Sequence, residues 1–138
     1  MELVLDNNIF FSLMNPDSVN SYLFSLLNAK FFAPEYLKEE LEEHKAECLV
    51  KSNLSEHEFK IRQKEIEDDI KLFEFSKYKA FLKEAINSLS DPEDSPYVAL
   101  ALSINASIWS NDNHITSQSL VKSFTTNKLF SKMIAGKV

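Results

Sequence analysis

The feature that most constrains the fold is the alternation of short apolar runs with segments of helical pattern. Each short run has the length and apolar content of a buried strand, and the runs cover residues 2–6, 31–33, 72–75, 107–110 and 123–126. Between the runs, apolar residues recur at the spacing of a helix face. Strands that alternate with helices are typical of α/β domains. We therefore expect an α/β fold of three layers, α/β/α, with a central parallel sheet of about five strands.

The helical segments are expected at residues 9–13, 19–27, 34–49, 55–71, 78–89, 97–104 and 117–122, with a last helix from residue 127 onward. Pro34 suits the start of a long helix, because its missing N–H has no helical acceptor there. Ser55 lies three residues before Glu58, which predicts a capping box at the start of the charged helix. That charged helix either covers the edge of the domain or supplies the surface of a homodimer.

The length and composition predict one soluble domain over residues 1–138. No apolar run approaches the ~20 residues needed to span a bilayer, and Met1–Asp6 lacks the basic region of a signal peptide. Cys48 is the only cysteine, which excludes an internal disulfide and favours a reduced cytoplasmic location. Gly136 is the only glycine, so glycine-rich phosphate loops and the dinucleotide-binding fingerprint are both excluded.

The charge is unevenly distributed, although the formal net charge is -6. After Asp112 the chain has no acidic residue, and its charged residues there are Lys122, Lys128, Lys132 and Lys137. Two interpretations of this basic C-terminal part remain open. It is either a solvated helix face or a strip that follows a phosphate backbone beside an acidic, metal-dependent site.

Two acidic residues fall where functional groups gather in a parallel sheet, just beyond the carboxyl ends of strands. Asp6 closes the first predicted strand, and Asp112 follows the strand at residues 107–110. A carboxylate beside a buried strand end is costly unless it is paired or bound to a cation. For either acid taken alone, the favoured explanation is the cap of a following helix.

Two further acidic residues lie on predicted helices. Glu40 shares a helix face with Leu37 and Leu41, so it points inward, and Glu39 is the alternative if the helix phase is shifted by one residue. Asp94 lies at the entry of an apolar helix, where the helix dipole favours a carboxylate and where a simple N-cap is also sufficient. Together the acids suit Mg²⁺ or Mn²⁺, which prefer oxygen ligands, and two such ions would support an in-line phosphodiester displacement.

Three segments carry a resemblance to a known family. They are Leu3–Ser12, with the acid that ends the first strand; Ala33–Leu41, with one inward Glu; and Asp91–Leu102 together with Ile108–Asp112. In this order they resemble the PIN domain (PilT N-terminus-like) family, which includes VapC-type toxins and RNA-processing nucleases.

The resemblance implies a five-stranded parallel sheet, dependence on Mg²⁺ or Mn²⁺, and endonucleolytic cleavage of RNA, with an antitoxin protein as partner if the chain is a toxin. It implies catalytic and metal-binding roles for Asp6, Glu40, Asp94 and Asp112, and supporting roles for Asn8, Asp91 and Ser110. His114 stands where many members have another acid, and the only arginine is Arg62 in the charged helix.

Other functions remain as alternatives. The first is a PIN-like module that binds RNA or protein with little catalysis. A phosphatase of the haloacid-dehalogenase type would need an acid at position 8, where this chain has Asn8. His44 lies one helical turn from Glu40, and its position favours a partly buried structural histidine over a contact with the acidic cluster. His57 and His114 are expected at the surface.

Overall fold

The computed structural model describes residues 1–138 and contains one sheet of five parallel strands. The strands are β1 (Glu2–Leu5), β2 (Lys30–Pro34), β3 (Ile70–Phe73), β4 (Ser107–Trp109) and β5 (Ser123–Phe124). Their order across the sheet is β3-β2-β1-β4-β5, and every neighbouring pair is parallel. The expected parallel α/β sheet is confirmed.

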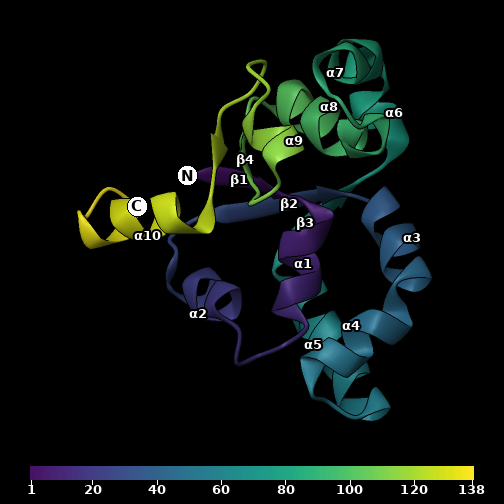
Figure 1. Ribbon diagram of the computed structural model, residues 1–138, viewed down its shortest axis with the longest axis vertical. Coiled ribbons are helices and arrows are strands. Elements are labelled where there is room, and N and C mark those ends of the chain that lie inside the picture. The colour runs from purple at the N-terminus through teal and green to yellow at the C-terminus, as the bar shows by residue number, and fades with distance from the viewer.

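Helices cover both faces of the sheet (Figure 1). One group consists of α6 (Phe75–Tyr78), α7 (Leu82–Ser88) and α8 (Ser95–Ile104), with 3₁₀ turns at Lys79–Phe81 and Pro92–Asp94. The group on the opposite face consists of α1 (Asn7–Leu13), α2 (Val19–Leu26) and α5 (Glu56–Asp68). From the end of β2, α3 (Tyr36–Glu43) and α4 (Lys45–Ser52) curve toward α5. The short α9 (Asn113–Thr116) follows β4, and α10 (Thr126–Ile134) ends the chain.

The core is built around β1 and α8. Leu3, Val4 and Leu5 have no exposed surface, because β1 has a strand on either side and helices on both faces. The middle of α8, residues 97–101, is also fully buried, and this helix packs against β1, β2 and β4. A helix that is apolar on all sides belongs in the interior. Its position brings the residues that precede it, including Asp94, to the carboxyl end of the sheet.

The long helix predicted from Pro34 to Leu49 was wrong in two respects. Pro34 is the last residue of β2, and the next residue continues the pairing with β3, since the N–H of Glu35 lies 2.8 Å from the carbonyl oxygen of Phe73. The helix begins at Tyr36 and is interrupted at His44, whose backbone (φ -105°, ψ 12°) leaves the helical region. The segment therefore forms two helices, α3 and α4, which change direction between them.

Other boundaries also differ: the strand predicted at residues 72–75 is β3 at Ile70–Phe73, and the helix predicted at residues 78–89 is divided into α6, a 3₁₀ turn and α7. The charged helix keeps its predicted capping box of Ser55 and Glu58 but ends at Asp68, because Ile70 enters β3. The helix expected at residues 117–122 is absent. There the side chain of Gln118 bonds the backbone of Val121 in both directions, at 2.8 and 3.0 Å, and so replaces helical hydrogen bonds.

None of the helices combines the length and the apolar character that crossing a membrane requires.

Candidate functional site

The point where the strand order reverses fixes the position of the candidate site. From β1 the chain builds β2 and β3 on one side and then crosses to build β4 and β5 on the other. Ligands of open α/β sheets bind at the carboxyl ends of the two strands that flank such a reversal. Leu5 is paired with Trp109, so the residues that follow, Asp6 and Ser110, lie side by side at this edge.

Asp6 is the most completely buried of the acids, with no exposed surface. One carboxylate oxygen accepts the N–H of Ile9 at 2.8 Å and caps α1, and the other accepts the hydroxyl of Ser110. The pKa of Asp6 is raised to about 6: burial is the largest cause, the two hydrogen bonds lower the pKa, and the charges of Asp112 and Glu40 add to the increase. Both interpretations of Asp6, helix cap and member of an acidic cluster, therefore apply.

Glu40 is the inward-facing acid of α3, with 7% of its surface exposed, whereas Glu39 is exposed. Its two carboxylate oxygens accept different donors: the hydroxyl of Tyr97, and the side-chain amide of Asn7 at 2.7 Å. Burial raises the pKa of Glu40, and these two hydrogen bonds partly offset that effect. The predicted helix phase is therefore correct, and Glu40 is held in place by residues of α1 and α8.

Asp94 lies at the start of α8, but its side chain does not cap that helix. The N-cap explanation is therefore wrong for this residue, and its carboxylate is free of that role. Only 7% of Asp94 is exposed. Burial is the largest cause that raises the pKa of Asp94 to about 7, followed by the charges of Asp112, Asp91, Asp6 and Glu40. Each of these four charges disfavours the ionised form of Asp94.

Asp112 and Asp91 are half-buried and each caps a local turn. Asp112 accepts the N–H of His114 at 2.8 Å and begins α9, as the capping interpretation predicted. Asp91 accepts the N–H of Glu93 at 3.0 Å. In each case the bond uses a single carboxylate oxygen, so the second oxygen remains available to a ligand.

The supporting residues differ in part from the prediction. Ser110 contacts an acid directly, since its hydroxyl donates to Asp6 and also accepts the N–H of Asp112 at 3.0 Å. Asn8 does not: it is exposed, and its side chain makes no hydrogen bond to any of the acids. The neighbouring Asn7 makes such a contact, because residue 7 begins α1 with its side chain toward α3.

Tyr97 is a site residue that the sequence analysis missed. It is fully buried and donates its hydroxyl to Glu40, and burial beside that carboxylate raises the pKa of Tyr97 well above its ordinary value. The phenol therefore keeps its proton and acts as a donor. The available signal was its position one helical turn after Asp94, on an otherwise apolar helix.

The three histidines lie outside the cluster. His57 and His114 are exposed, as expected, and His114 contacts the hydroxyl of Ser90. His44, predicted to be a partly buried structural histidine, is exposed instead, with 49% of its side chain accessible. Its ring packs against Phe11, with 5.7 Å between the ring centroids, and when protonated its charge lowers the pKa of Glu40.

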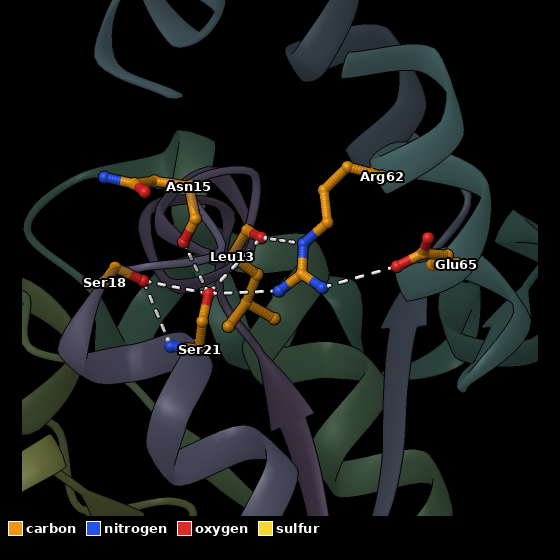
Figure 2. A network of polar contacts seen from close by, with 6 residues as sticks. All are labelled: Leu13, Asn15, Ser18, Ser21, Arg62 and Glu65. Carbon is orange, nitrogen blue, oxygen red and sulfur yellow. Dashed lines mark hydrogen bonds and ion pairs between the residues drawn. The ribbon is translucent and has the colours of Figure 1, made fainter. Parts of the chain in front are cut away.

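Arg62 does not approach the acids and instead joins α5 to the turn between α1 and α2 (Figure 2). Its guanidinium donates to the carbonyl oxygen of Leu13 at 2.8 Å and to the hydroxyl of Ser21 at 3.2 Å, and it lies 3.6 Å from the carboxylate of Glu65. Only 18% of the Arg62 side chain is exposed. The only arginine is therefore a structural link between helices on one face of the sheet.

The chemistry of the donors fits a hard divalent cation. The candidate ligands are all carboxylates, the oxygen donors that Mg²⁺ and Mn²⁺ prefer, and none of the four ion pairs in the structure involves them. Their charge thus has no cationic partner within the chain. No three His, Cys, Asp or Glu side chains are gathered closely enough in the structure to hold one metal ion.

Comparison with known proteins gives one family match and two informative structural matches. The family described as PIN domain matches residues 4–133. No curated protein sequence matches the chain.

Among solved structures, the crystal structure of VapBC2 from Rickettsia felis, bound to a DNA fragment from its promoter, is similar with a TM-score of 0.70 and 15% identity. FitAcB from Neisseria gonorrhoeae is similar with a TM-score of 0.57 and 16% identity. Each match covers 91% of this chain and 98% of the other. At such low identity these two matches establish the fold.

Proposed function

Because the chain belongs to the PIN domain family, we propose that it is a metal-dependent endoribonuclease. We propose Asp6, Glu40, Asp94 and Asp112 as its catalytic residues and metal ligands; because no three of these side chains lie close enough in this structure to hold one ion, binding of the metal must draw them together. The observation that carries the proposal is a group of acids at the carboxyl end of the sheet, three of them buried, with no Lys or Arg beside them. Buried charges of one sign are unfavourable unless a cation compensates them, and Mg²⁺ or Mn²⁺ is the cation that carboxylate oxygens select.

Bound Mg²⁺ or Mn²⁺ supplies the Lewis acidity that activates a water and stabilises the charge that develops on the scissile phosphate. The protein keeps the ligands in place. Ser110 donates to Asp6, and Tyr97 and Asn7 donate to Glu40 at its two oxygens. Each acid keeps free lone pairs for coordination, because a carboxylate accepts about four hydrogen bonds and these donors use only one or two. Asp91 adds negative charge beside Asp94 in a supporting role.

The test is cleavage of an unstructured RNA by the purified chain, with and without Mn²⁺, together with calorimetric titration of the protein with Mn²⁺. We expect cleavage only with the metal and a measurable heat of binding. If the protein neither cleaves RNA nor binds the ion, the nuclease proposal is rejected, and the alternative of a PIN-like RNA- or protein-binding module takes its place.

We propose further that the chain is the toxin of a toxin–antitoxin pair, with a small antitoxin protein that blocks the acidic site. Two structural neighbours, VapBC2 and FitAcB, support this proposal through their fold. We take residues 1–138 to form a single domain that acts in the cytoplasm, where the buried Cys48 stays a free thiol. Co-purification of the chain with the product of an adjacent small gene, with loss of cleavage in the complex, is the expected result.

The C-terminal lysines provide a separate prediction. Lys122 and Lys132 both lie over the ring of Phe124, 5.2 and 5.3 Å from its centroid. Asn111, next to Ser110, bonds the backbone N–H of Thr126 at 2.8 Å and so ties the start of α10 to the site. The basic strip of Lys122, Lys128 and Lys132 is therefore joined to the catalytic edge of the sheet.

If this strip binds phosphates, replacing Lys122, Lys128 and Lys132 with Gln should reduce the dependence of RNA affinity on salt. Each phosphate contact to single-stranded RNA contributes about 0.7 to the slope of log K against log salt, so the triple variant should lose about 2. Fluorescence anisotropy over a range of salt concentrations measures this slope. The matched control replaces the exposed lysines Lys60, Lys64 and Lys83, which changes the net charge equally. Equal slopes for both variants would remove the strip from the proposal.

A further inference from the structure

A cavity of about 500 Å³ lies between α1 and α4, next to the candidate active site. It is lined by Asn7, Asn8, Phe11, Ser12, Asn15, Ser18, His44, Glu47, Cys48 and Lys51. Asn7 belongs to both places, because it lines this cavity and donates its side-chain amide to Glu40 at 2.7 Å. Whatever binds in the cavity is therefore one side chain away from a proposed metal ligand.

The wall of the cavity is mostly polar, and the helical spacing of its residues explains why. His44, Glu47, Cys48 and Lys51 recur at the spacing of one face of α4. Facing them, α1 contributes amides and hydroxyls, and the only apolar side chains of the lining are Phe11 and Cys48. A wall of this composition does not suit an apolar helix of a protein partner, which would leave these polar groups without hydrogen bonds. It suits a small polar ligand, and about 500 Å³ is within the usual range for such sites.

The rings of Phe11 and His44 both border the cavity, but they are tilted toward each other and share no common plane. Phe11 is half-buried and His44 is exposed, and their planes meet at 51° with the centroids 5.7 Å apart. Rings that are partly open to solvent at the edge of a polar cavity are a platform on which an unpaired nucleobase can stack. Phe11 is held from behind by the core, so the platform is rigid on one side.

Hydrogen-bonding groups without a partner lie beside these rings. The side chain of Asn8 makes no hydrogen bond, and Asn15 uses only its oxygen, which accepts the N–H of Asp17 at 3.0 Å. An Asn amide presents a donor and an acceptor side by side, which matches the N7 and N6 groups of adenine. Lys51, which also lines the cavity, is exposed and paired with Glu47 at 2.7 Å.

From these features we propose that the cavity binds one unpaired adenine base of the substrate RNA, adjacent to the cleaved bond. The base stacks on the ring of Phe11, with the tilted ring of His44 at its edge, and is bonded by the Asn8 amide. This inference rests on the proposed ribonuclease function. It extends that function because the cavity gives the enzyme a preference for one base, which the acids alone do not provide. Asn8, which does not touch the acids, thereby acquires a role in binding RNA.

The experiment separates binding from cleavage. Short single-stranded oligoadenylate and oligouridylate are bound to Asp94→Asn protein, which is expected to be inactive, and affinity is measured by fluorescence anisotropy. We expect oligoadenylate to bind more tightly than oligouridylate. Adding Asn8→Ala or His44→Ala should weaken oligoadenylate binding about tenfold and remove the preference. The matched controls, Asn87→Ala and His57→Ala, change an exposed residue of the same type outside the cavity and should have no effect.

In the protein with Asp94 intact, Asn8→Ala should raise KM for oligoadenylate cleavage with little change in kcat, since the residue contacts the base and not the acids. If RNA is cleaved but the cavity variants behave like Asn87→Ala and His57→Ala, the base site is rejected and the nuclease proposal stands. If no protein cleaves RNA but Asn8→Ala still removes the oligoadenylate preference, the nuclease proposal fails and the base site stands. The inference would also be overturned if these substitutions weakened the binding of a partner protein and left RNA binding unchanged.

Discussion

In the presence of Mn²⁺, Asp94→Asn is expected to cleave RNA about a thousandfold more slowly than the unaltered chain. Asn has the size of Asp but carries no charge. The substitution therefore removes a metal ligand and preserves the packing of a residue that is only 7% exposed. Asp94 is the best of the acids for this test because its side chain does not cap α8. Cleavage rates at saturating Mn²⁺ measure the effect.

Matched controls separate the loss of a ligand from a general loss of charge. Asp17→Asn changes an exposed aspartate that accepts no side-chain hydrogen bond, and it should cleave normally. The pair Glu40→Gln and Glu39→Gln is sharper still, since the two residues are adjacent and only Glu40 is buried. We expect Glu40→Gln to be inactive and Glu39→Gln to be active. Equal activity of Asp94→Asn and Asp17→Asn, with both proteins folded by circular dichroism, would contradict the assignment of the metal ligands.

Without divalent ions, the free energy of unfolding should fall by about 6 kcal/mol as the pH rises from about 4 to about 7. The pKa of Asp94 is about 7 and that of Asp6 is about 6 in the folded chain, whereas both begin from 3.8. Below the unfolded value both states hold these protons, and the stabilising contribution is fully present. As the pH rises above the unfolded pKa, the unfolded chain releases these protons before the folded chain does. The stability of the fold therefore falls until the pH exceeds the folded pKa values of Asp6 and Asp94.

Urea unfolding at a series of pH values measures this loss, and Asp94→Asn identifies its source. The variant cannot ionise at residue 94, so its stability should change less with pH and should exceed that of the unaltered chain near neutral pH. Glu47 and Glu58, whose pKa values are lowered, act in the opposite direction and are common to both proteins. Adding Mn²⁺ should restore stability to the unaltered chain and not to the variant, because a ligand stabilises only the state that binds it. Parallel stability curves for the two proteins would contradict the shifted pKa of Asp94.

The sheet and the inward acid of α3 were predictable because their signals are local. A strand buried on both faces has no polar positions, and the run Leu3–Leu5 therefore identified β1 without any other information. Glu40 was predictable for a similar reason, since it shares its helix face with Leu37 and Leu41, which are also buried. Pro34 was misassigned because a proline at a helix start and one at a strand end look alike in sequence. The choice depended on β3, which supplies the acceptor for the N–H of Glu35.

The sequence by itself predicted the five strands in their order along the chain and indicated the four acids proposed for the site, because burial and helix phase leave periodic patterns in one chain. Only the tertiary structure decided how those acids are held. Ser110 is 104 residues from Asp6, and Tyr97 is 57 residues from Glu40. These contacts exist because β4 lies beside β1 and α8 lies across the sheet. The same is true of the cavity between α1 and α4, which exists because the chain bends at His44. Side chains so distant in sequence share no periodicity, so their pairing is a property of the packed fold.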